Sequence, residues 1–382
     1  MKVLMVSDVY FPRVNGVSTS IETFRSKLPT QDVTVDLLVP DYGKDAAEDG
    51  VYRVASSPVP RDPEDRLMSW WKAKRLFPIL SANDYQVIHI QTPFIAHYLG
   101  IRLARRLGLP VVATYHTLFE EYLQHYLPML PASWLRACAR AVSRWQCNGL
   151  DRVIVPSLAM AERLKSYGVT VPLRVLPTGI PLVRFQGGNR QRFREDYGIE
   201  SSRPVALFVG RVAFEKNIQF LIESLESLRV TQPDILLVIA GEGPARQTLV
   251  EQVARRGLQN HVLFLGYLDR ETGLPDVYAG SDVFVFASRT ETQGLVLLEA
   301  MAAGLPVVAL AIMGTKDILR PELGARIAPD DPQGFAQAVD DVLGSSATRR
   351  KMRLEGMAYA AEWSDDAMAQ RLATLYTELK KN

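Results

Sequence analysis

The chain has 382 residues, of which 47% are hydrophobic and 23% are charged, and its formal net charge is +2. This length exceeds one ordinary core, so we expect a soluble globular protein with two domains of ordinary size. The small net charge argues against a dedicated nucleic-acid-binding protein, and no apolar run reaches the ~20 residues that a membrane-spanning helix needs.

From the amino terminus, short apolar strands alternate with helical patterns. The strands are predicted at 2–7, 33–39, 87–90, 111–114 and 153–156, and the helices at 18–28, 94–107 and 133–150. The first apolar run ends at Asp8, too early for a signal peptide. Cys138 and Cys147 have no CxxC spacing, so a reducing cytoplasm, without a disulfide framework or a zinc site, fits best.

The alternation pauses at 172–188, where prolines and glycines cluster, and this is the predicted domain boundary. A second series has strands at 205–209, 235–240, 262–265, 283–286, 307–309 and 325–328, and helices at 217–228, 244–256, 295–303 and 332–343. The tail, 349–380, is helical with a break near Trp363-Ser364. The predicted fold class is α/β, with two doubly wound, Rossmann-like domains, 1–180 and 181–363, facing each other across a cleft suited to a nucleotide.

Two carboxylates lie eight positions apart in the second half. Glu291 follows the buried strand 282–287, on the loop where open α/β sheets place ligands. Glu299 lies about 7 Å along the next helix, counted at ~1.5 Å per residue from Gly294. Together they can hold two parts of one elongated polar ligand.

Two cations follow the first strand of the second half. Arg211 and Lys216 lie in a strand-to-helix loop beside a helix amino terminus, where a guanidinium fork and an ammonium would hold a diphosphate. The chain has no GxxxxGK[ST] loop and no GxGxxG after any strand, which lowers the expectation of a P-loop ATPase or an NAD-dependent dehydrogenase.

The first half has weaker signals of a ligand site. Asn15-Gly16 is a turn that would let backbone N–H groups approach a ligand, and an ordinary turn is the alternative. His116 comes just past the end of strand 111–114. The five histidines are scattered and no DxD pair stands in a suitable loop, so no metal ligand set is visible.

Basic residues and tryptophans share two segments of the first half. Trp70 and Trp71 lie among lysines and arginines, and Arg136, Arg140 and Arg144 recur every four residues between Trp134 and Trp145. Such a stripe is typical of a helix lying on a membrane surface. The alternative is a solvated helix face with the tryptophans packed beneath it.

Six segments together resemble the retaining glycosyltransferases of family 4, which have the GT-B fold. The segments are the NGV loop, TYHT, GRVAFEKN, GEGP, TETQGLVLLEAMAAGLPVV and the late Trp363-Ser364. The resemblance runs over nearly the whole chain. It implies that the terminal helix, 364–382, packs back on the first domain, and that neither a metal nor a cofactor is needed.

The resemblance also implies roles for single residues. Arg211 and Lys216 would hold the donor diphosphate, and Glu299 the ribose hydroxyls. Glu291 would hold the hydroxyls of the sugar together with the backbone of the four residues that follow it, Thr292, Gln293, Gly294 and Leu295. The N–H of Gly16 would contact phosphate, and His116 would contact the sugar close to the reacting carbon.

The motif details favour one donor and acceptor class. Gln293 replaces the Phe that many members of the family carry there. The form TETQGL, with TYHT and the downstream residues Glu120 to Tyr126, is most similar to bacterial diacylglycerol glucosyltransferases that use UDP-glucose. GDP-mannose-dependent mannosyltransferases are the alternative, as are a soluble or polysaccharide acceptor and a non-catalytic sugar-nucleotide-binding module. We expect a cytoplasmic hexosyltransferase on the inner face of the cell membrane, and the sequence leaves linkage and oligomeric state open.

Overall fold

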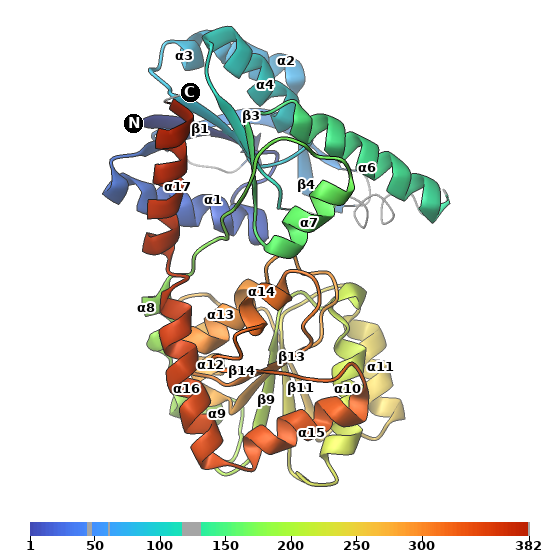
Figure 1. Cartoon of the computed structure of the whole chain (residues 1–382). Coiled ribbons are helices and arrows are strands. Elements are labelled where there is room, and N and C mark those ends of the chain that lie inside the picture. Colours follow the sequence, from blue (N-terminus) through green and yellow to red (C-terminus); the bar gives the residue numbers. More distant parts are fainter. Residues whose placement is uncertain (44–47, 60–61, 117–130, 381–382) are drawn as a thin grey trace. The chain divides into compact units, whose positions relative to one another are not determined.

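The computed structural model describes residues 1–43, 48–59, 62–116 and 131–380. The chain forms two compact units (Figure 1). Unit 1 consists of Met1–Gly179 and Asp365–Asn382, and unit 2 of Ile180–Ser364. Each unit has its own sheet and its own apolar core.

Unit 1 is built on an eight-stranded sheet of order β4-β3-β2-β1-β5-β6-β7-β8. The strands are β1 (Lys2–Val6), β2 (Thr34–Asp41), β3 (Val51–Val59), β4 (Asp62–Met68), β5 (Val87–Ile90), β6 (Val111–Thr114), β7 (Arg152–Val155) and β8 (Leu173–Val175). All neighbours pair in parallel except β3 and β4. The carboxyl ends of β1, β5, β6 and β7 therefore share one edge of the sheet.

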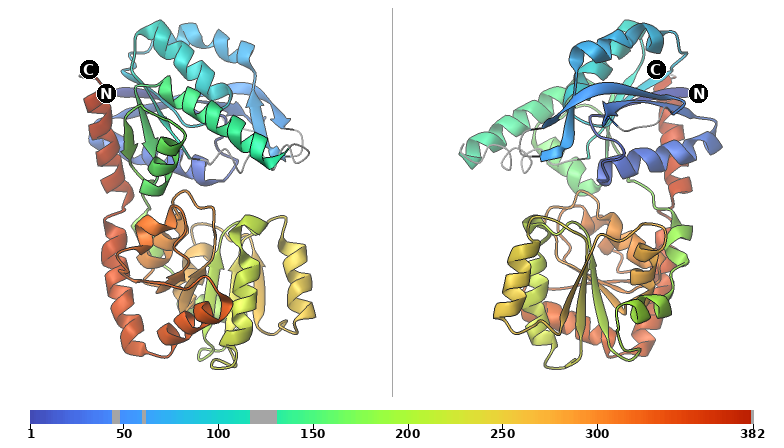
Figure 2. Two further views of the ribbon diagram at one scale, coloured as in Figure 1. Left: turned by 45° about the vertical axis from the view of Figure 1, so that its right-hand side comes forward. Right: turned by 180° about the vertical axis from the view of Figure 1, so that it is seen from behind.

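The helices of unit 1 cover both faces of its sheet (Figure 2). They are α1 (Gly16–Lys27), α2 (Trp70–Arg75), α3 (Phe77–Ser81), α4 (Ile95–Leu107), α6 (Ala132–Asn148), α7 (Leu158–Ser166) and the last helix, α17 (Asp365–Lys380), with a 3-10 turn at Leu28–Gln31. Helix α17 packs on α1 (Figure 1), and its Met368, Leu372 and Tyr376 belong to the core that also holds Val3 and Met5. The apolar side chains of α17 therefore complete the core beside a sheet whose first strand lies more than three hundred residues earlier in the chain.

Unit 2 is built on a six-stranded parallel sheet of order β11-β10-β9-β12-β13-β14. The strands are β9 (Val205–Val209), β10 (Leu236–Ala240), β11 (Val262–Gly266), β12 (Val283–Phe286), β13 (Val307–Ala309) and β14 (Ala325–Ile327). The chain steps outward from β9 to β11 and then returns to β12 on the other side of β9. The loops after β9 and β12 thus leave in opposite directions, at the point where open α/β sheets bind ligands.

The helices of unit 2 also cover both faces of its sheet (Figure 2). They are α8 (Leu182–Gln186), α9 (Arg190–Asp196), α10 (Ile218–Leu228), α11 (Arg246–Arg255), α12 (Gly273–Gly280), α13 (Leu295–Ala302), α14 (Thr315–Leu319), α15 (Pro332–Leu343) and α16 (Ser346–Ala361), with a 3-10 turn at Phe214–Lys216. Fully buried Phe208, Phe284 and Phe286 stack in the core. The predicted α/β class is confirmed, with one parallel sheet in unit 2 and a sheet in unit 1 that is parallel except for β3 and β4.

Several elements escaped the sequence prediction. The pair β3 and β4 is the largest, because its strands carry polar residues instead of an apolar run, and β3 is partly exposed. The segment 172–188 was predicted as a break, but it contains β8 and α8. Helices α7 and α12 are short, and their periodicity is too brief to stand out from the sequence.

Candidate active site

The candidate donor site lies in unit 2, where β9 and β12 run side by side. Arg211 and Lys216 follow β9, and Glu291 follows β12. The two strands are neighbours, so the Lys216 ammonium donates directly to Oε1 of Glu291, although the residues are 75 positions apart. Lys216 and Glu291 are largely buried, whereas Arg211 is exposed. Two of the residues predicted to bind the donor therefore contact each other.

The loop that carries Arg211 is held by the loop after β10. Val212 N–H donates to the carbonyl of Glu242 at 2.8 Å, and Gly210 N–H to the carbonyl of Ala240 at 3.0 Å. Gly241 has a φ of +137°, and a Cβ there would lie 1.9 Å from the carbonyl oxygen of Gly210. The segment GEGP is therefore a strand-to-helix turn whose glycines let two backbone segments touch, which fixes the position of Arg211.

The loop that carries Glu291 is supported from the loop after β13. Gly314 N–H donates to the Glu291 carbonyl at 2.9 Å. A Cβ on Gly314 would lie 2.1 Å from the carbonyl oxygen of Thr292, so only glycine permits this approach. Gln293 is buried, and Gly294, with a φ of +96°, directly precedes the first residue of α13, Leu295. This turn gathers the Glu291 carboxylate and the amino terminus of α13 on one side of the sheet.

Glu299 lies on α13 and is only 9% exposed. The hydroxyl of Tyr278, on α12, donates to its Oε2 at 2.9 Å. Burial raises the pKa of Glu299, while the nearby Arg270, the Tyr278 hydroxyl and Arg184 act in the opposite direction. One carboxylate oxygen is thus held by the protein, and a ligand hydroxyl can donate to the other. Tyr278 was missed by the sequence prediction because no local pattern distinguishes it from a core tyrosine.

Gly16 and His116 belong to unit 1. Gly16 opens α1, and the side chain of Asn15 caps this helix by accepting from the N–H groups of Val17 and Ser18 at 3.0 and 2.9 Å. A Cβ on Gly16 would meet nothing within 4 Å. The space beside Gly16 is therefore open, and the positive end of the α1 dipole points into it.

His116 lies just after β6, and its Nε2 is 2.8 Å from Oε1 of Gln91. Burial lowers the pKa of His116 to about 4, so the imidazole is neutral at pH 7. The strand behind it is fixed by His89, whose two ring nitrogens lie 2.6 Å from the Tyr376 hydroxyl and 2.7 Å from the Thr114 hydroxyl. Gln91, also missed, directly follows the strand predicted at 87–90, and the same rule that selected His116 would have found it.

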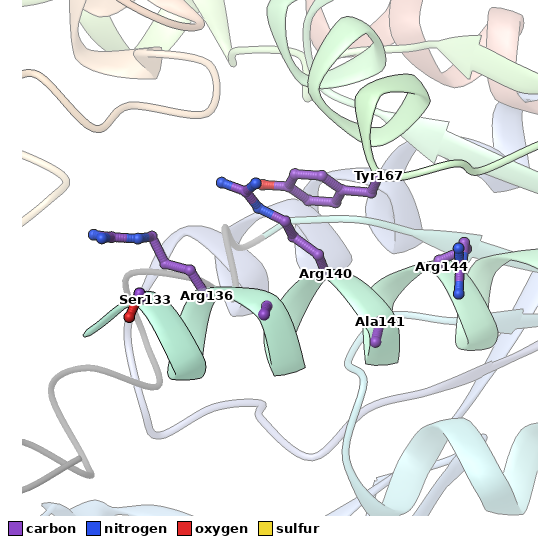
Figure 3. A pocket seen from close by; sticks show the side chains of 7 residues that line it. Ser133, Arg136, Arg140, Ala141, Arg144 and Tyr167 are labelled. Atoms are coloured by element: carbon purple, nitrogen blue, oxygen red, sulfur yellow. The ribbon is translucent and has the colours of Figure 1, made fainter. Parts of the chain in front are cut away.

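The arginines predicted to contact a membrane lie along α6. Arg136, Arg140 and Arg144, which we call the arginine row, line an open groove of about 470 Å³ together with Tyr167 (Figure 3). The guanidinium of Arg140 lies 5.6 Å from the centre of the Tyr167 ring. The row is thus a concentration of positive charge beside an aromatic ring.

The tryptophans of this region are not packed beneath the charges. Trp134 and Trp145 are 57% and 64% exposed on α6, and Trp71 is 73% exposed on α2, while Trp70 is half-buried. Trp134 and Trp145 are eleven residues apart, about three helical turns, so they lie on the same side of α6. The alternative of a solvated face above packed tryptophans is wrong for these three residues.

In the part of the chain that the structure describes, no helix is long and apolar enough to cross a bilayer, and no group of three or more potential metal ligands comes together. Cys138 and Cys147 are free thiols. The motif residues Glu120 to Tyr126 lie outside the described residues.

Two family models match the chain, one in each half. Residues 14–184 match the model described as Glycosyltransferase Family 4, and residues 189–358 the model described as Glycosyl transferases group 1. The alpha-monoglucosyldiacylglycerol synthase of Streptococcus pneumoniae is 34% identical over 320 residues, which cover 81% of this chain and 71% of that protein. The chain belongs to the family 4 glycosyltransferases. The predicted family and the glycosyltransferase activity are thereby confirmed.

Further relatives and solved structures agree with this family. The GDP-mannose-dependent alpha-mannosyltransferase of Mycobacterium tuberculosis is 30% identical over 342 residues, which cover 86% of this chain and 84% of that protein. Among solved structures, the sucrose-phosphate synthase of Thermosynechococcus elongatus superposes with a TM-score of 0.80 at 22% identity, with 99% of each chain covered. Anabaena HepE in complex with UDP and glucose gives a TM-score of 0.77 at 18% identity, with 99% and 100% covered. The predicted GT-B fold is confirmed.

Proposed function

We propose that this glycosyltransferase moves a hexose from a nucleoside diphosphate sugar to a hydroxyl of a membrane lipid, with UDP-glucose as the favoured donor. The observation that carries the proposal is the grouping of Arg211, Lys216, Glu291 and Glu299 around the switch point of the unit 2 sheet. Two cations suit a diphosphate, and two separated carboxylates suit the hydroxyls of two sugar rings.

The contact between Lys216 and Glu291 suggests how the donor is received. A diphosphate offers Lys216 more negative charge than one carboxylate does, so the ammonium turns to the phosphate and Glu291 is released. Glu291 then accepts hydrogen bonds from the hexose hydroxyls, and the backbone N–H groups of Thr292 to Leu295 donate hydrogen bonds to them. Glu299 accepts from the ribose hydroxyls through the oxygen that Tyr278 does not occupy.

The proposed reaction is a transfer with retention of configuration. As the nucleoside diphosphate departs, its bond to the anomeric carbon breaks and that carbon gains oxocarbenium character. Positive charge at Arg211 and Lys216 stabilises the departing diphosphate most strongly at that moment, so it lowers the barrier. The acceptor oxygen forms the new bond on the same face, and its proton passes to the departing phosphate oxygen.

His116 and Gly16 would act from unit 1. A neutral His116 can exchange hydrogen bonds with a sugar hydroxyl without adding a charge beside a developing cation. The N–H of Gly16 would donate to phosphate, helped by the dipole of α1. Fixed cations and N–H groups take the place of a metal in this proposal, and no cofactor takes part.

A lipid acceptor is supported by the relatives and by helix α6. The names of similar proteins include alpha-monoglucosyldiacylglycerol synthases from Streptococcus pneumoniae and Acholeplasma laidlawii. In this chain, the arginine row would attract anionic headgroups, whereas Trp134 and Trp145 lie on another side of α6, so the row alone is assigned to the membrane surface. The enzyme would then work from the surface of the cell membrane, on its cytoplasmic side.

The decisive experiment is a donor screen that measures release of the nucleoside diphosphate. UDP- and GDP-hexoses are each incubated with the enzyme, with and without diacylglycerol in anionic vesicles. We expect the fastest release with UDP-glucose and diacylglycerol together. Faster release with GDP-mannose would identify the mannosyltransferase alternative, and binding without release under all conditions would identify a non-catalytic module.

Membrane association is tested by flotation with vesicles that contain anionic lipid. One variant replaces the arginine row by glutamine, and its matched control removes the same charge from exposed helix positions of unit 2, by Arg255→Gln, Arg350→Gln and Lys351→Gln. Each arginine near an anionic surface contributes about 1 kcal/mol, so the first variant should bind on the order of a hundredfold more weakly. Equal flotation of both variants would exclude α6 as the membrane contact.

A further inference from the structure

Unit 1 contains a cavity of about 280 Å³, and of its lining side chains only His116 has so far been given a role toward a substrate. It lies where β1, β5 and β6 end, between these strands and helices α4 and α6. Most of its wall is apolar, with contributions from Val9, Val17, Ile90, Ala113, Cys147 and Leu150, and His116 stands among its lining residues.

Most polar side chains in the wall already have partners inside the protein. Arg66 on β4 is an exception, because its guanidinium lies 5.5 Å from the centre of the Tyr42 ring and its Nε has no hydrogen-bond partner among the described residues. Asp8 accepts from the Thr92 hydroxyl at 2.8 Å and from the Ala96 N–H at 3.0 Å. Gln146 donates to the carbonyl of Pro93 at 2.8 Å, and Gln91 is engaged with His116. These groups have little hydrogen-bonding capacity left for a ligand.

The two histidines of the wall differ in what they can offer. His97 is buried against the edge of the Tyr98 ring, and burial lowers its pKa to about 4, so it carries no charge at pH 7. His116 has one ring nitrogen engaged with Gln91, and its other nitrogen can meet a hydroxyl group.

A wall of this kind discriminates between classes of ligand. A sugar would lose its water and find few partners for its many hydroxyls, which costs ~1–3 kcal/mol for each unsatisfied group. A hydrocarbon loses nothing by this exchange, because transfer from water to an apolar wall is favourable for it.

We infer that this cavity binds the hydrocarbon chain of an amphiphilic acceptor whose hydroxyl lies at His116. The inference rests on the proposed transfer to a lipid and names the part of the enzyme that selects the lipid. An apolar cavity of about 150 Å³ holds one benzene, which has six carbons. By the same packing, 280 Å³ holds about ten carbons of one alkyl chain.

This capacity predicts a chain-length dependence. Each methylene that moves from water into an apolar site gains about 0.8 kcal/mol, which is about fourfold in affinity. The affinity should therefore rise about fourfold with each added carbon and level off near ten carbons, where the chain has filled the cavity.

The test is calorimetric binding of 1-O-alkylglycerols with four to fourteen carbons, each below its critical micelle concentration, to the full chain without a donor. Two variants change the capacity in opposite directions. Leu150→Ala enlarges the cavity and should move the plateau up by about three carbons, and Ala113→Leu should move it down by about three. If one variant fails to fold, the other still measures the shift.

A matched control separates the cavity from general effects of substitution. Val142→Ala removes a side chain from the exposed side of α6 and should leave both the plateau and the affinities unchanged. A wild-type series without chain-length dependence, or a plateau that stays in place in the resizing variants, would overturn the inference.

Failure of the inference and failure of the proposed function give different results. Alkylglycerols that bind with the predicted plateau but never receive a hexose would leave the cavity assigned and the transfer wrong. Hexose transfer to diacylglycerol that is unaffected by the resizing variants would support the proposed transfer and overturn the inference about the cavity. Tighter binding of a short-chain sugar acceptor than of the alkylglycerols would have the same meaning.

Discussion

Replacing Tyr278 by phenylalanine would remove the hydroxyl that holds Glu299 while keeping the ring that packs beside it. The ring of Tyr278 is fully buried and meets Phe185 edge-on with centroids 5.8 Å apart. The change therefore takes away one hydrogen bond of 2.9 Å to a buried carboxylate and very little packing. A hydrogen bond to a charged group contributes ~1.5–3 kcal/mol.

Part of this loss should appear in donor binding. Without Tyr278, the carboxylate is no longer fixed, and its pKa rises further because the hydroxyl had lowered it. We expect the dissociation constant of the nucleoside diphosphate to increase about tenfold, which is ~1.4 kcal/mol. In both proteins the affinity should fall as the pH falls through the pKa of Glu299, and in Tyr278→Phe this fall should begin at a higher pH.

The assay compares two ligands by calorimetry between pH 6 and pH 8. One is the nucleoside diphosphate of the preferred donor, and the other is its 2′,3′-dideoxy counterpart, which lacks the hydroxyls that Glu299 would accept from. The wild type should prefer the ribose form, and Tyr278→Phe should lose most of that preference. If the variant weakened both ligands equally, Tyr278 would have a structural role only, and the assignment of Glu299 to the ribose would lose its support.

Three further outcomes follow from the structure. Lys216→Ala should lower kcat by ~10²–10³, measured as release of the nucleoside diphosphate, and an unchanged rate would exclude Lys216 from stabilising the leaving group. Gly314→Ala places a Cβ 2.1 Å from the Thr292 carbonyl oxygen, so the donor loop must shift; donor affinity should fall at least tenfold in calorimetry, and wild-type affinity would contradict the close approach. His97 is neutral when folded, with a pKa lowered to about 4 from 6.5, so only the unfolded chain binds its proton as the pH falls below 6.5. Between pH 7 and pH 5, the free energy of unfolding should therefore fall by about 2 kcal/mol less in His97→Phe than in the wild type, measured by urea unfolding. Equal falls in both proteins would refute this.

The strands were largely predictable from the sequence. The stretches 205–209, 283–286 and 307–309 coincide with β9, β12 and β13, because fully buried parallel strands are short apolar runs bounded by turn residues. The pair β3 and β4 was not predictable in this way, since polar residues interrupt both strands and leave no continuous apolar run. Its existence depends on β2 offering a free edge.

The candidate donor residues were also found from the sequence. Arg211 and Glu291 each directly follow a recognisable strand, and the carboxyl end of a strand is where such folds place their ligands. Gln91 was missed although it also directly follows a strand, because its amide is uncharged and does not by itself indicate a ligand site. The roles of all these residues stay predictions until the donor experiments are made.

The sequence by itself determined the class of fold, the family and the residues at the strand ends, because each depends on a pattern within one short segment. Only the tertiary structure decided which of those residues meet. Lys216 reaches Glu291 because β9 and β12 are neighbours, and Tyr278 reaches Glu299 because α12 and α13 both pack against α8. The cavity beside His116 arises in the same way, from strands and helices that are far apart in the chain. Contacts of this kind depend on long-range packing, so they cannot be predicted from the periodicity of a short segment.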